Sequence, residues 1–211
     1  MRYSFRIHPS ASVTRLEKLI ASRLQPEADT QAIDERIWEL FGETWAIMFT
    51  DLSGFSRRVK EFGIIHFLQT IYESHRILVP QIDAFNGILI KVEGDSLMVL
   101  FKQPQRALDC AIAMQQALHK HNRHRLPEEQ VLLCVGIGYG RLLKIGDEDV
   151  FGTEVNAASK LGEDTAKAWE ILITQGVRDA IEIAESQLEA LAEAPPGASG
   201  AWRVNYSLAD I

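Results

Sequence analysis

Two aspartates, each at the edge of an apolar segment, constrain the fold of this chain most strongly. Asp51 follows the apolar run 45–49, and Asp95 lies in a Gly-Asp turn between the apolar segments 87–91 and 97–101. These runs have the length and composition of buried strands, and the last two are predicted to form a hairpin around that turn. A carboxylate at the end of a buried strand must be hydrogen-bonded, paired with a cation or bound to a metal. Burying an unpaired carboxylate costs several kcal/mol of free energy or neutralises the group.

Two such acids at neighbouring strand ends suit hard divalent cations, which take oxygen ligands and leave positions for substrate phosphates. An isolated Asp-x-x-Gly segment, as at 51–54, more often caps a turn or a helix start. Either explanation accounts for one aspartate alone, so the rest of the chain has to decide between them.

Length and charge narrow the class of protein. A chain of 211 residues is long enough for one full domain with appendages. It has no stretch of about 20 uninterrupted apolar residues and no secretory signal, so we expect no membrane span and, by default, a cytoplasmic location. A net charge of −7 argues against nucleic acid as a partner, since a general nucleic-acid binder needs a basic face.

Two other groups of residues favour structural roles. Cys110 and Cys134 lie far apart in apolar segments, which predicts buried thiols rather than a disulfide or a metal pair. The basic segment 119–125 ends a predicted helix, where cations complement the helix dipole. A zinc site built from its histidines is the alternative, although no cysteine or carboxylate companion stands at ligand spacing.

The chain divides into three predicted parts. The main domain should be of the α+β class, with a mixed, ferredoxin-like sheet and its helices on one face. The parts are a helical N-terminal extension at 1–43 (helices 13–24 and 30–41), the main domain at 44–185, and a tail at 186–211 with a possible edge strand at 202–208.

Within the main domain, the apolar periodicity and the turn residues predict the order β-αα-ββ-α-ββ-α-β-α. The expected elements are a strand at 45–50, helices at 53–61 and 64–79, strands at 87–91 and 97–101, a helix at 104–119, strands at 131–139 and 142–145 joined as a hairpin at Gly140, a helix at 156–161, a strand at 171–174, and a helix from about 176.

Three short motifs follow one another in this order. They are Asp51-Leu52-Ser53-Gly54-Phe55, then Lys91 with Gly94-Asp95, then Asp-Val-Phe-Gly-Thr-Glu-Val-Asn-Ala-Ala-Ser-Lys at 149–160. Each motif alone is weak, but the three in order resemble the catalytic domain of the class III nucleotidyl cyclases, the adenylate and guanylate cyclases. The resemblance runs from about residue 44 to residue 177, which is most of the chain.

This resemblance implies a metal site. In the family two aspartates bridge a pair of divalent cations, so Asp51 and Asp95 would hold two Mg or Mn ions, with the backbone of Leu52 beside them. Gly54 and Phe55 would lie near the triphosphate. The reaction needs such cations because the ribose 3′-hydroxyl attacks the α-phosphate while pyrophosphate leaves, and charge develops on both oxygens.

The same resemblance implies the remaining contacts. Lys91 and Asp149 would read the base, since a lysine donates to a ring nitrogen of adenine and an aspartate accepts from its exocyclic amine. Asn156 would orient the ribose, and Lys160, where the family has arginine, would stabilise the transition-state phosphate. The last two lie four residues apart and so share a helix face. Glu93 should point to the same side of its strand as Lys91, where it would pair with Lys91 or Arg141.

The chain departs from the family pattern in three places. Lys160 replaces arginine, which favours slower turnover because lysine lacks the bidentate fork. Cys134 stands where many members carry arginine, and no Lys-Gly phosphate contact is evident near the C-terminus. Pyrophosphate would then need other groups, and the candidates are Arg57, Arg141 and Lys144.

The resemblance therefore predicts an adenylate cyclase with ATP as substrate, acting as a homodimer in which each chain completes the other's site. One alternative keeps the chemistry and changes the base to guanine or a pyrimidine. Another is a regulatory nucleotide-binding module with little turnover. The N-terminal extension would be an autoinhibitory arm, a dimer clasp or the remnant of a longer signalling region.

Overall fold

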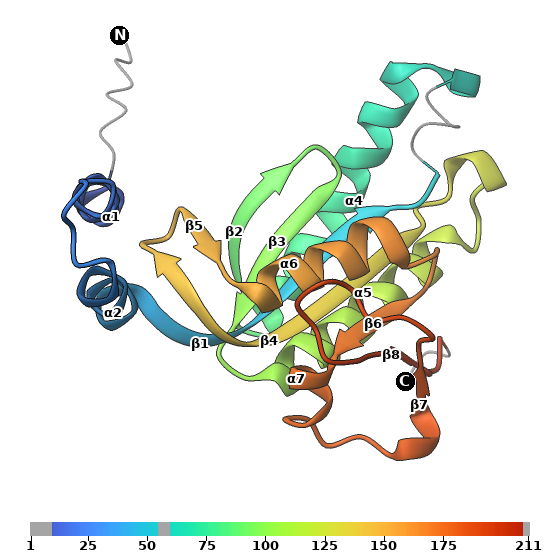
Figure 1. Cartoon of the computed structure of the whole chain (residues 1–211). Coiled ribbons are helices and arrows are strands. Elements are labelled where there is room, and N and C mark those ends of the chain that lie inside the picture. Colours follow the sequence, from blue (N-terminus) through green and yellow to red (C-terminus); the bar gives the residue numbers. More distant parts are fainter. Residues whose placement is uncertain (1–9, 55–59, 209–211) are drawn as a thin grey trace, which may run out of the picture.

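The computed structural model describes residues 10–54 and 60–208, and one mixed sheet organises them (Figure 1). Its strand order is β2-β3-β1-β4-β6-β8-β7, with β5 paired to the far end of β4. The strands are β1 (Gly42–Leu52), β2 (Ile88–Glu93), β3 (Ser96–Phe101), β4 (Leu133–Ile145), β5 (Asp149–Phe151), β6 (Ile171–Thr174), β7 (Leu188–Ala190) and β8 (Ala201–Val204). Only β4 and β6 pair in parallel among the described strands.

Helices pack on the faces of this sheet, and two further helices precede it at the N-terminus (Figure 1). They are α1 (Ala11–Arg23), α2 (Thr30–Phe41), α4 (Ile64–Ala84), α5 (Pro104–Asn122), α6 (Thr153–Ser159) and α7 (Gln175–Arg178), with short 3-10 turns η1 (Pro127–Glu129) and η3 (Glu185–Gln187) and a π-helix η2 (Lys160–Thr165). The predicted α+β sheet with a helical N-terminal region is confirmed. The helix expected at 53–61 lies largely outside the described residues.

Helices cover both faces of the sheet, so the expectation of helices on one face is wrong. Along β1, Ala46 and Met48 belong to the core shared with α4 and α5, while Ile47 belongs to a second core with Val155 and Ala158 of α6. Such alternation is what two buried faces require of a strand. Figure 1 shows α6 on the opposite side of the sheet from α4 and α5.

Glycine on β4 allows this second layer to form. A Cβ placed on Gly136 would lie 2.2 Å from the carbonyl oxygen of Ala158 and 2.3 Å from the amide nitrogen of Gly162. The backbone of α6 and η2 therefore rests directly on the strand. A glycine contributes nothing to an apolar pattern, which is why the sequence did not reveal this helix-bearing face.

The hairpin predicted at Gly140 is also wrong, because β4 runs straight through that residue. Gly140 pairs with Trp45 of β1, and a Cβ on it would lie 2.9 Å from Cγ of Glu154. The close packing of Glu154, not a turn, requires the glycine. The chain instead reverses at Gly146, whose φ of +60° suits glycine, and β5 returns along the end of β4.

The C-terminal tail enters the sheet. The strand expected at an edge is β8, and it lies inside the sheet because β6 pairs with one side of it and β7 with the other. The outer position belongs to β7, a strand that the sequence did not predict. The helix predicted from about 176 is the four-residue α7.

The two N-terminal helices begin at or close to their predicted starts, at Ala11 against 13 and at Thr30 against 30. The Asp29 carboxylate accepts the N–H of Ala32 at 3.0 Å and caps α2. This pair of helices packs on the end of β4 through Ile37, Phe41 and Ile145. Strand β1 follows α2 without a linker, two residues before the predicted start of the main domain. The described residues include no helix both long and apolar enough to cross a membrane.

Candidate active site

Two acidic residues meet where β1 ends and β3 begins. Thr50 of β1 pairs with Leu97 of β3, and Thr50 Oγ1 accepts the Leu97 N–H at 3.2 Å. Asp51 follows Thr50 and Ser96 precedes Leu97, so Asp51 and Ser96 also lie side by side. Ser96 Oγ donates to Asp51 Oδ1 at 3.4 Å. Asp95 occupies the β2–β3 turn one residue earlier. We call Asp51 and Asp95 the carboxylate end of the site.

The carboxylate end is electrostatically unfavourable without a cation. Burial raises the pKa of Asp51 to about 6, and the negative charge of Asp95 adds to the rise. Burial also raises the pKa of Asp95. The N–H of Leu52 hydrogen bonds to both carboxylates and opposes these shifts. Since no ion pair to either acid is found within the described residues, a divalent cation fits this end chemically.

Protein side chains alone do not complete a metal cage there. Across residues 10–54 and 60–208, no three His, Cys, Asp or Glu side chains group closely enough to hold a metal ion. A cation bound by Asp51 and Asp95 would therefore keep open positions. This is the arrangement expected where substrate phosphates supply the remaining oxygens.

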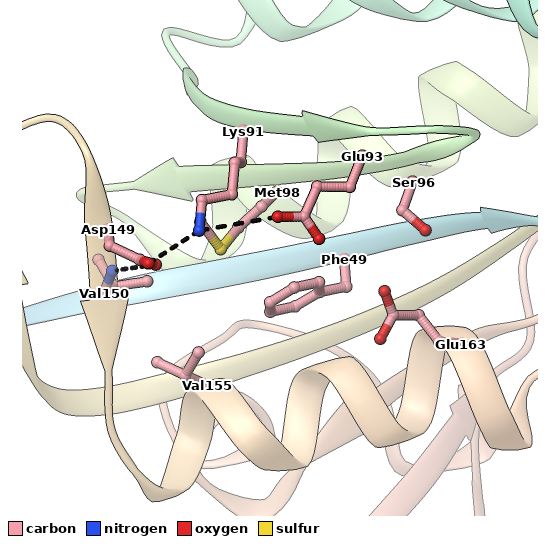
Figure 2. Close-up of a pocket in the computed structure, with 9 residues that line it drawn as sticks. All are labelled: Phe49, Lys91, Glu93, Ser96, Met98, Asp149, Val150, Val155 and Glu163. Atoms are coloured by element: carbon pink, nitrogen blue, oxygen red, sulfur yellow. Dashed lines mark hydrogen bonds and ion pairs between the residues drawn. The ribbon is translucent and has the colours of Figure 1, made fainter. Parts of the chain in front are cut away.

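An ion pair closes the other end of the site (Figure 2). Lys91 of β2 donates from Nζ to Asp149 Oδ2 at 2.8 Å, and the hydrogen bond raises the pKa of Lys91. The N–H of Val150 donates to the second oxygen, Asp149 Oδ1, at 2.9 Å. Glu93 Oε1 lies 3.8 Å from Lys91 Nζ on the opposite side from Asp149. We call Lys91 and Asp149 the ion-pair end.

An irregularity in β2 aims these side chains into the site. The β2–β3 register shifts between Leu89 and Lys91. After the shift, Lys91 stands opposite Met98 and Glu93 opposite Ser96. Bulges of this kind often redirect side chains next to active sites.

A cavity of about 170 Å³ lies at the ion-pair end and reaches Ser96, the neighbour of the carboxylate end; Asp51 and Asp95 themselves do not line it. Apolar and charged side chains both line it: Phe49, Lys91, Glu93, Ser96, Met98, Asp149, Val150, Val155 and Glu163. Cavities for ligands of drug size measure roughly 300–1,000 Å³. One chain therefore offers room for a nucleobase but not for a whole nucleoside triphosphate.

The structure does not bring every predicted residue to this cavity. Asn156 and Lys160 lie on α6 and at the start of η2, they are exposed, and neither lines the cavity. Lys160 Nζ donates to the carboxylate of Asp164 instead. Gly54 follows Asp51 in a turn with φ +89°, and Phe55 lies outside the described residues.

The candidates for a pyrophosphate contact point elsewhere. Arg141 stacks on the ring of Trp38 and bonds its carbonyl oxygen, and Lys144 donates to Asp147 at 2.8 Å. Both cations therefore face the N-terminal helices, while Arg57 lies outside the described residues. Cys134 pairs with Asp51 across the sheet, and burial raises the pKa of its thiol to about 12. It carries no charge that could replace an arginine.

Three residues of the site escaped the sequence analysis. Glu163 of η2 lines the cavity, and its charge contributes to the raised pKa of Asp51. Ser96 binds the carboxylate end directly. His75 of α4 lies near enough to Asp95 for each charge to affect the other's pKa. No sequence signal separates these residues from ordinary polar positions: the packing of η2 and α4 brings Glu163 and His75 to the site, and the pairing of β1 with β3 brings Ser96.

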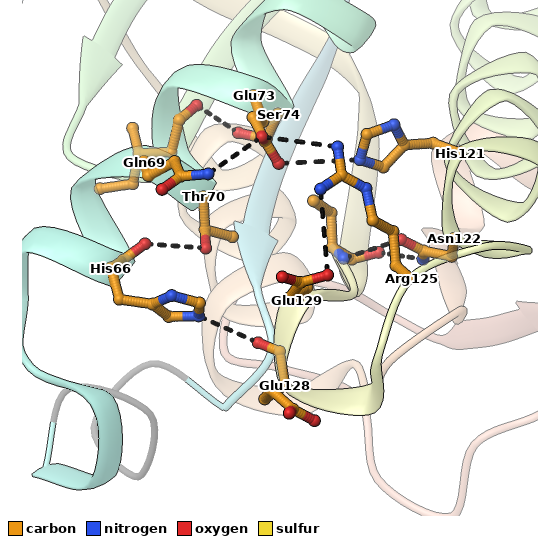
Figure 3. Close-up of polar contacts among 12 residues, drawn as sticks. His66, Gln69, Thr70, Glu73, Ser74, His121, Asn122, Arg125, Glu128 and Glu129 are labelled. Atoms are coloured by element: carbon orange, nitrogen blue, oxygen red, sulfur yellow. Dashed lines mark hydrogen bonds and ion pairs between the residues drawn. The ribbon is translucent and has the colours of Figure 1, made fainter.

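The basic segment 119–125 has a structural partner (Figure 3). Helix α5 ends at Asn122, three residues beyond its predicted end, and His121 and Arg125 approach the carboxylate of Glu73 on α4 at 3.8 and 3.6 Å. His66 of α4 contacts the carbonyl oxygen of Glu128 at 3.2 Å. These contacts connect α4 to the end of α5. Cys110 and Cys134 are both buried free thiols, as expected.

Comparison with known proteins gives a consistent family. The model of the adenylate and guanylate cyclase catalytic domain matches residues 42–195. A Myxococcus xanthus protein named serine/threonine-protein kinase pkn2 is 28% identical over 72% of this chain and 18% of its own length. An adenylate cyclase of Anabaena cylindrica is 30% identical over 62% of this chain and 29% of its own length. The chain thus spans less than a third of either relative.

Solved structures agree in fold. The crystal structure of an adenylate/guanylate cyclase/hydrolase from Silicibacter pomeroyi has a TM-score of 0.66 and 23% identity. The match covers 79% of this chain and 98% of that one. At this level of identity the likeness concerns the fold alone.

Proposed function

Since this chain belongs to the family of adenylate and guanylate cyclase catalytic domains, we propose that it converts ATP to 3′,5′-cyclic AMP and pyrophosphate. The observation that carries the proposal is a cavity lined by Lys91 and Asp149 that reaches Ser96, which binds the adjacent Asp51. The carboxylate end suits cations and phosphates, and the ion-pair end suits a base with one donor and one acceptor. We propose that 44–185 is the catalytic domain and that it acts in the cytoplasm.

The carboxylate end would hold two Mg or Mn ions through Asp51 and Asp95, beside the backbone of Leu52. Bound cations would neutralise charge on the attacking 3′-oxygen and on the departing pyrophosphate. The protein's part is to hold two repelling carboxylates together before the substrate arrives. The strand pairing of β1 with β3 and the turn at Gly94, whose φ is +62°, fix them in place. Gly54 and Phe55 would lie beside the triphosphate.

The ion-pair end would read adenine. Lys91 can donate to ring nitrogen N1, and Asp149 can accept from the N6 amine. Because Asp149 keeps a second bond from the N–H of Val150, its carboxylate stays oriented when Lys91 turns toward the base. Guanine offers a donor at N1 and an acceptor at position 6, so it meets the wrong group at both places.

A homodimer would complete the site. Asn156 and Lys160 are exposed and lie outside the cavity of their own chain, and that cavity is too small for ATP. We propose that they reach ATP bound by a second copy, with Asn156 on the ribose and Lys160 on the transition-state phosphate. A two-fold symmetric pair would then contain two equivalent sites. Specific activity should fall when the protein is diluted through the dimer dissociation range.

A second candidate function is nucleotide binding with little turnover. It is favoured by the ion pair of Lys160 with Asp164 and by the uncharged Cys134. Both features reduce the positive charge available to the phosphates. A change of base to guanine or a pyrimidine is a third possibility that keeps the carboxylate end.

The deciding experiment incubates the purified protein with ATP, GTP, CTP and UTP in turn, with Mg or Mn, and identifies products by mass. We expect cyclic AMP from ATP and none after Asp51→Ala. A different cyclic nucleotide would keep the mechanism and overturn the proposed base. Binding of nucleotide without pyrophosphate release, at concentrations where the protein is dimeric, would establish the binding module.

A further inference from the structure

Three charged groups form a row along one wall of the cavity (Figure 2). Asp149 lies at one side of the Lys91 ammonium at 2.8 Å, and Glu93 lies at the other side at 3.8 Å. All three line the cavity. A base that enters therefore faces an acceptor, a donor and a second acceptor in that order.

The first two groups of this row do not distinguish adenine from cytosine. Adenine presents its N6 amine and then the N1 acceptor, while cytosine presents its N4 amine and then the N3 acceptor. Both patterns satisfy Asp149 and Lys91 equally. The edges differ only at the next atom, which is a C2–H group in adenine and the O2 acceptor in cytosine.

We propose that Glu93 determines specificity by rejecting cytosine. Its carboxylate would face the O2 oxygen of cytosine, which places two acceptors against each other without a proton between them. The C2–H of adenine carries no lone pair and meets no such repulsion. Specific sites commonly combine an attractive contact with a repulsive one of this kind. This inference rests on the proposed cyclase function.

Glu93 is free to act on a ligand. Its side chain is 73% exposed, and within the described part of the chain its one ion pair is the 3.8 Å approach to Lys91. A pair of that length at the surface contributes little to stability. The residue also ends β2, so its replacement leaves the core unchanged. A substitution there should alter base selection and not folding.

The experiment compares kcat/KM for ATP and CTP in the natural protein, Glu93→Gln and Glu93→Ala. The glutamine amide can donate to O2 of cytosine, so Glu93→Gln should raise the CTP to ATP ratio about tenfold or more. Glu93→Ala removes the repulsion without adding a donor, so a smaller rise of about threefold is expected. Thermal unfolding of each variant checks that the fold is retained.

Glu163→Gln is the matched control, because Glu163 lines the same cavity but has no contact with Lys91. It should leave the CTP to ATP ratio unchanged, whatever its effect on the common rate. Competition binding of non-cyclisable ATP and CTP analogues should show the same shift in ratio as the kinetics. An unchanged ratio in Glu93→Gln, in a protein that does cyclise ATP, would overturn the inference. No cyclic product from the natural protein would instead refute the proposed function.

Discussion

The two ends of the site have opposite electrostatic character. At the carboxylate end, Asp51 and Asp95 repel each other and burial raises both pKa values. At the ion-pair end, Lys91 and Asp149 neutralise each other at 2.8 Å. Within the described residues the first end has no ion pair, and we propose that it takes up an external cation. The second is already paired within the chain, so a base bound as proposed would have to replace an internal contact.

This difference predicts how each end contributes to activity. An end that gains partners only when substrate and cations arrive can stabilise charge that develops in the reaction. An end that already pairs internally gains only the difference between the base contacts and the ion pair it gives up. We therefore expect the carboxylate end to control turnover and the ion-pair end to control selection among nucleotides.

The largest expected effect is that of Asp95→Ala. Removing one carboxylate of the pair should lower kcat on the order of 10³-fold, because the cations that it would hold contribute several kcal/mol to transition-state stabilisation. Pyrophosphate release in the presence of Mn measures this loss. The increase in unfolding temperature caused by Mn should disappear in the same variant. A loss of kcat below about tenfold would mean that the carboxylate end does not control turnover.

Lys91→Ala should have an intermediate effect. Losing one charged hydrogen bond to the base should lower kcat/KM for ATP about 10- to 50-fold, equivalent to roughly 2 kcal/mol. The stabilisation by Mn should persist, since Lys91 belongs to the other end. Lys102→Ala is the control, because that lysine pairs with Glu43 outside the cavity. If Lys91→Ala also abolished the response to Mn, the two ends could not be treated as independent.

The sequence predicted the strand ends that carry these groups, and the reason is local. Apolar runs and a Gly-Asp turn locate Asp51 and Asp95 without knowledge of the rest of the fold. The pairing of Lys91 with Asp149 is a long-range contact that periodicity does not contain. Its two residues came instead from the family resemblance, and the structure places them side by side.

The prediction from sequence was wrong where glycine on β4 allows other elements to pack closely. Gly136 and Gly140 have no side chain, so the backbone of α6 and the side chain of Glu154 can pack directly on β4. In a sequence, an isolated glycine within a strand pattern is easily taken for a turn. The same packing brings η2 and its Glu163 to the cavity. That contact therefore could not be predicted without the second helical layer.

Removing the charge at the carboxylate end should stabilise the metal-free protein. The folded pKa of Asp51 is raised to about 6, so stability from this group is complete below about pH 4 and is lost as the pH rises through 6. Asp51→Asn should therefore unfold at a higher temperature than the natural protein at about pH 8 with a chelator. We expect about 1 kcal/mol after allowing for solvent screening of a half-exposed group.

Two controls belong to this prediction. The advantage of Asp51→Asn should vanish below about pH 3, where the natural carboxyl is protonated in both the folded and the unfolded state. It should reverse when Mn is added, because only the natural protein gains binding energy from the ion. Equal stability of the two proteins at about pH 8 would show that Asp51 is not electrostatically strained.

Glu163→Gln should produce the smallest measurable change, and it tests how far the carboxylate end extends. The charge of Glu163 contributes to the raised pKa of Asp51, after burial and Asp95. Neutralising it should stabilise the metal-free protein at about pH 8 by a few tenths of a kcal/mol, as expected for a screened like-charge contact. Chemical unfolding at two pH values measures the difference.

Asp164→Asn is the matched control, because Asp164 binds Lys160 outside the cavity and should not alter the titration of Asp51. An effect of Glu163→Gln as large as that of Asp51→Asn would make Glu163 a third full member of the carboxylate end.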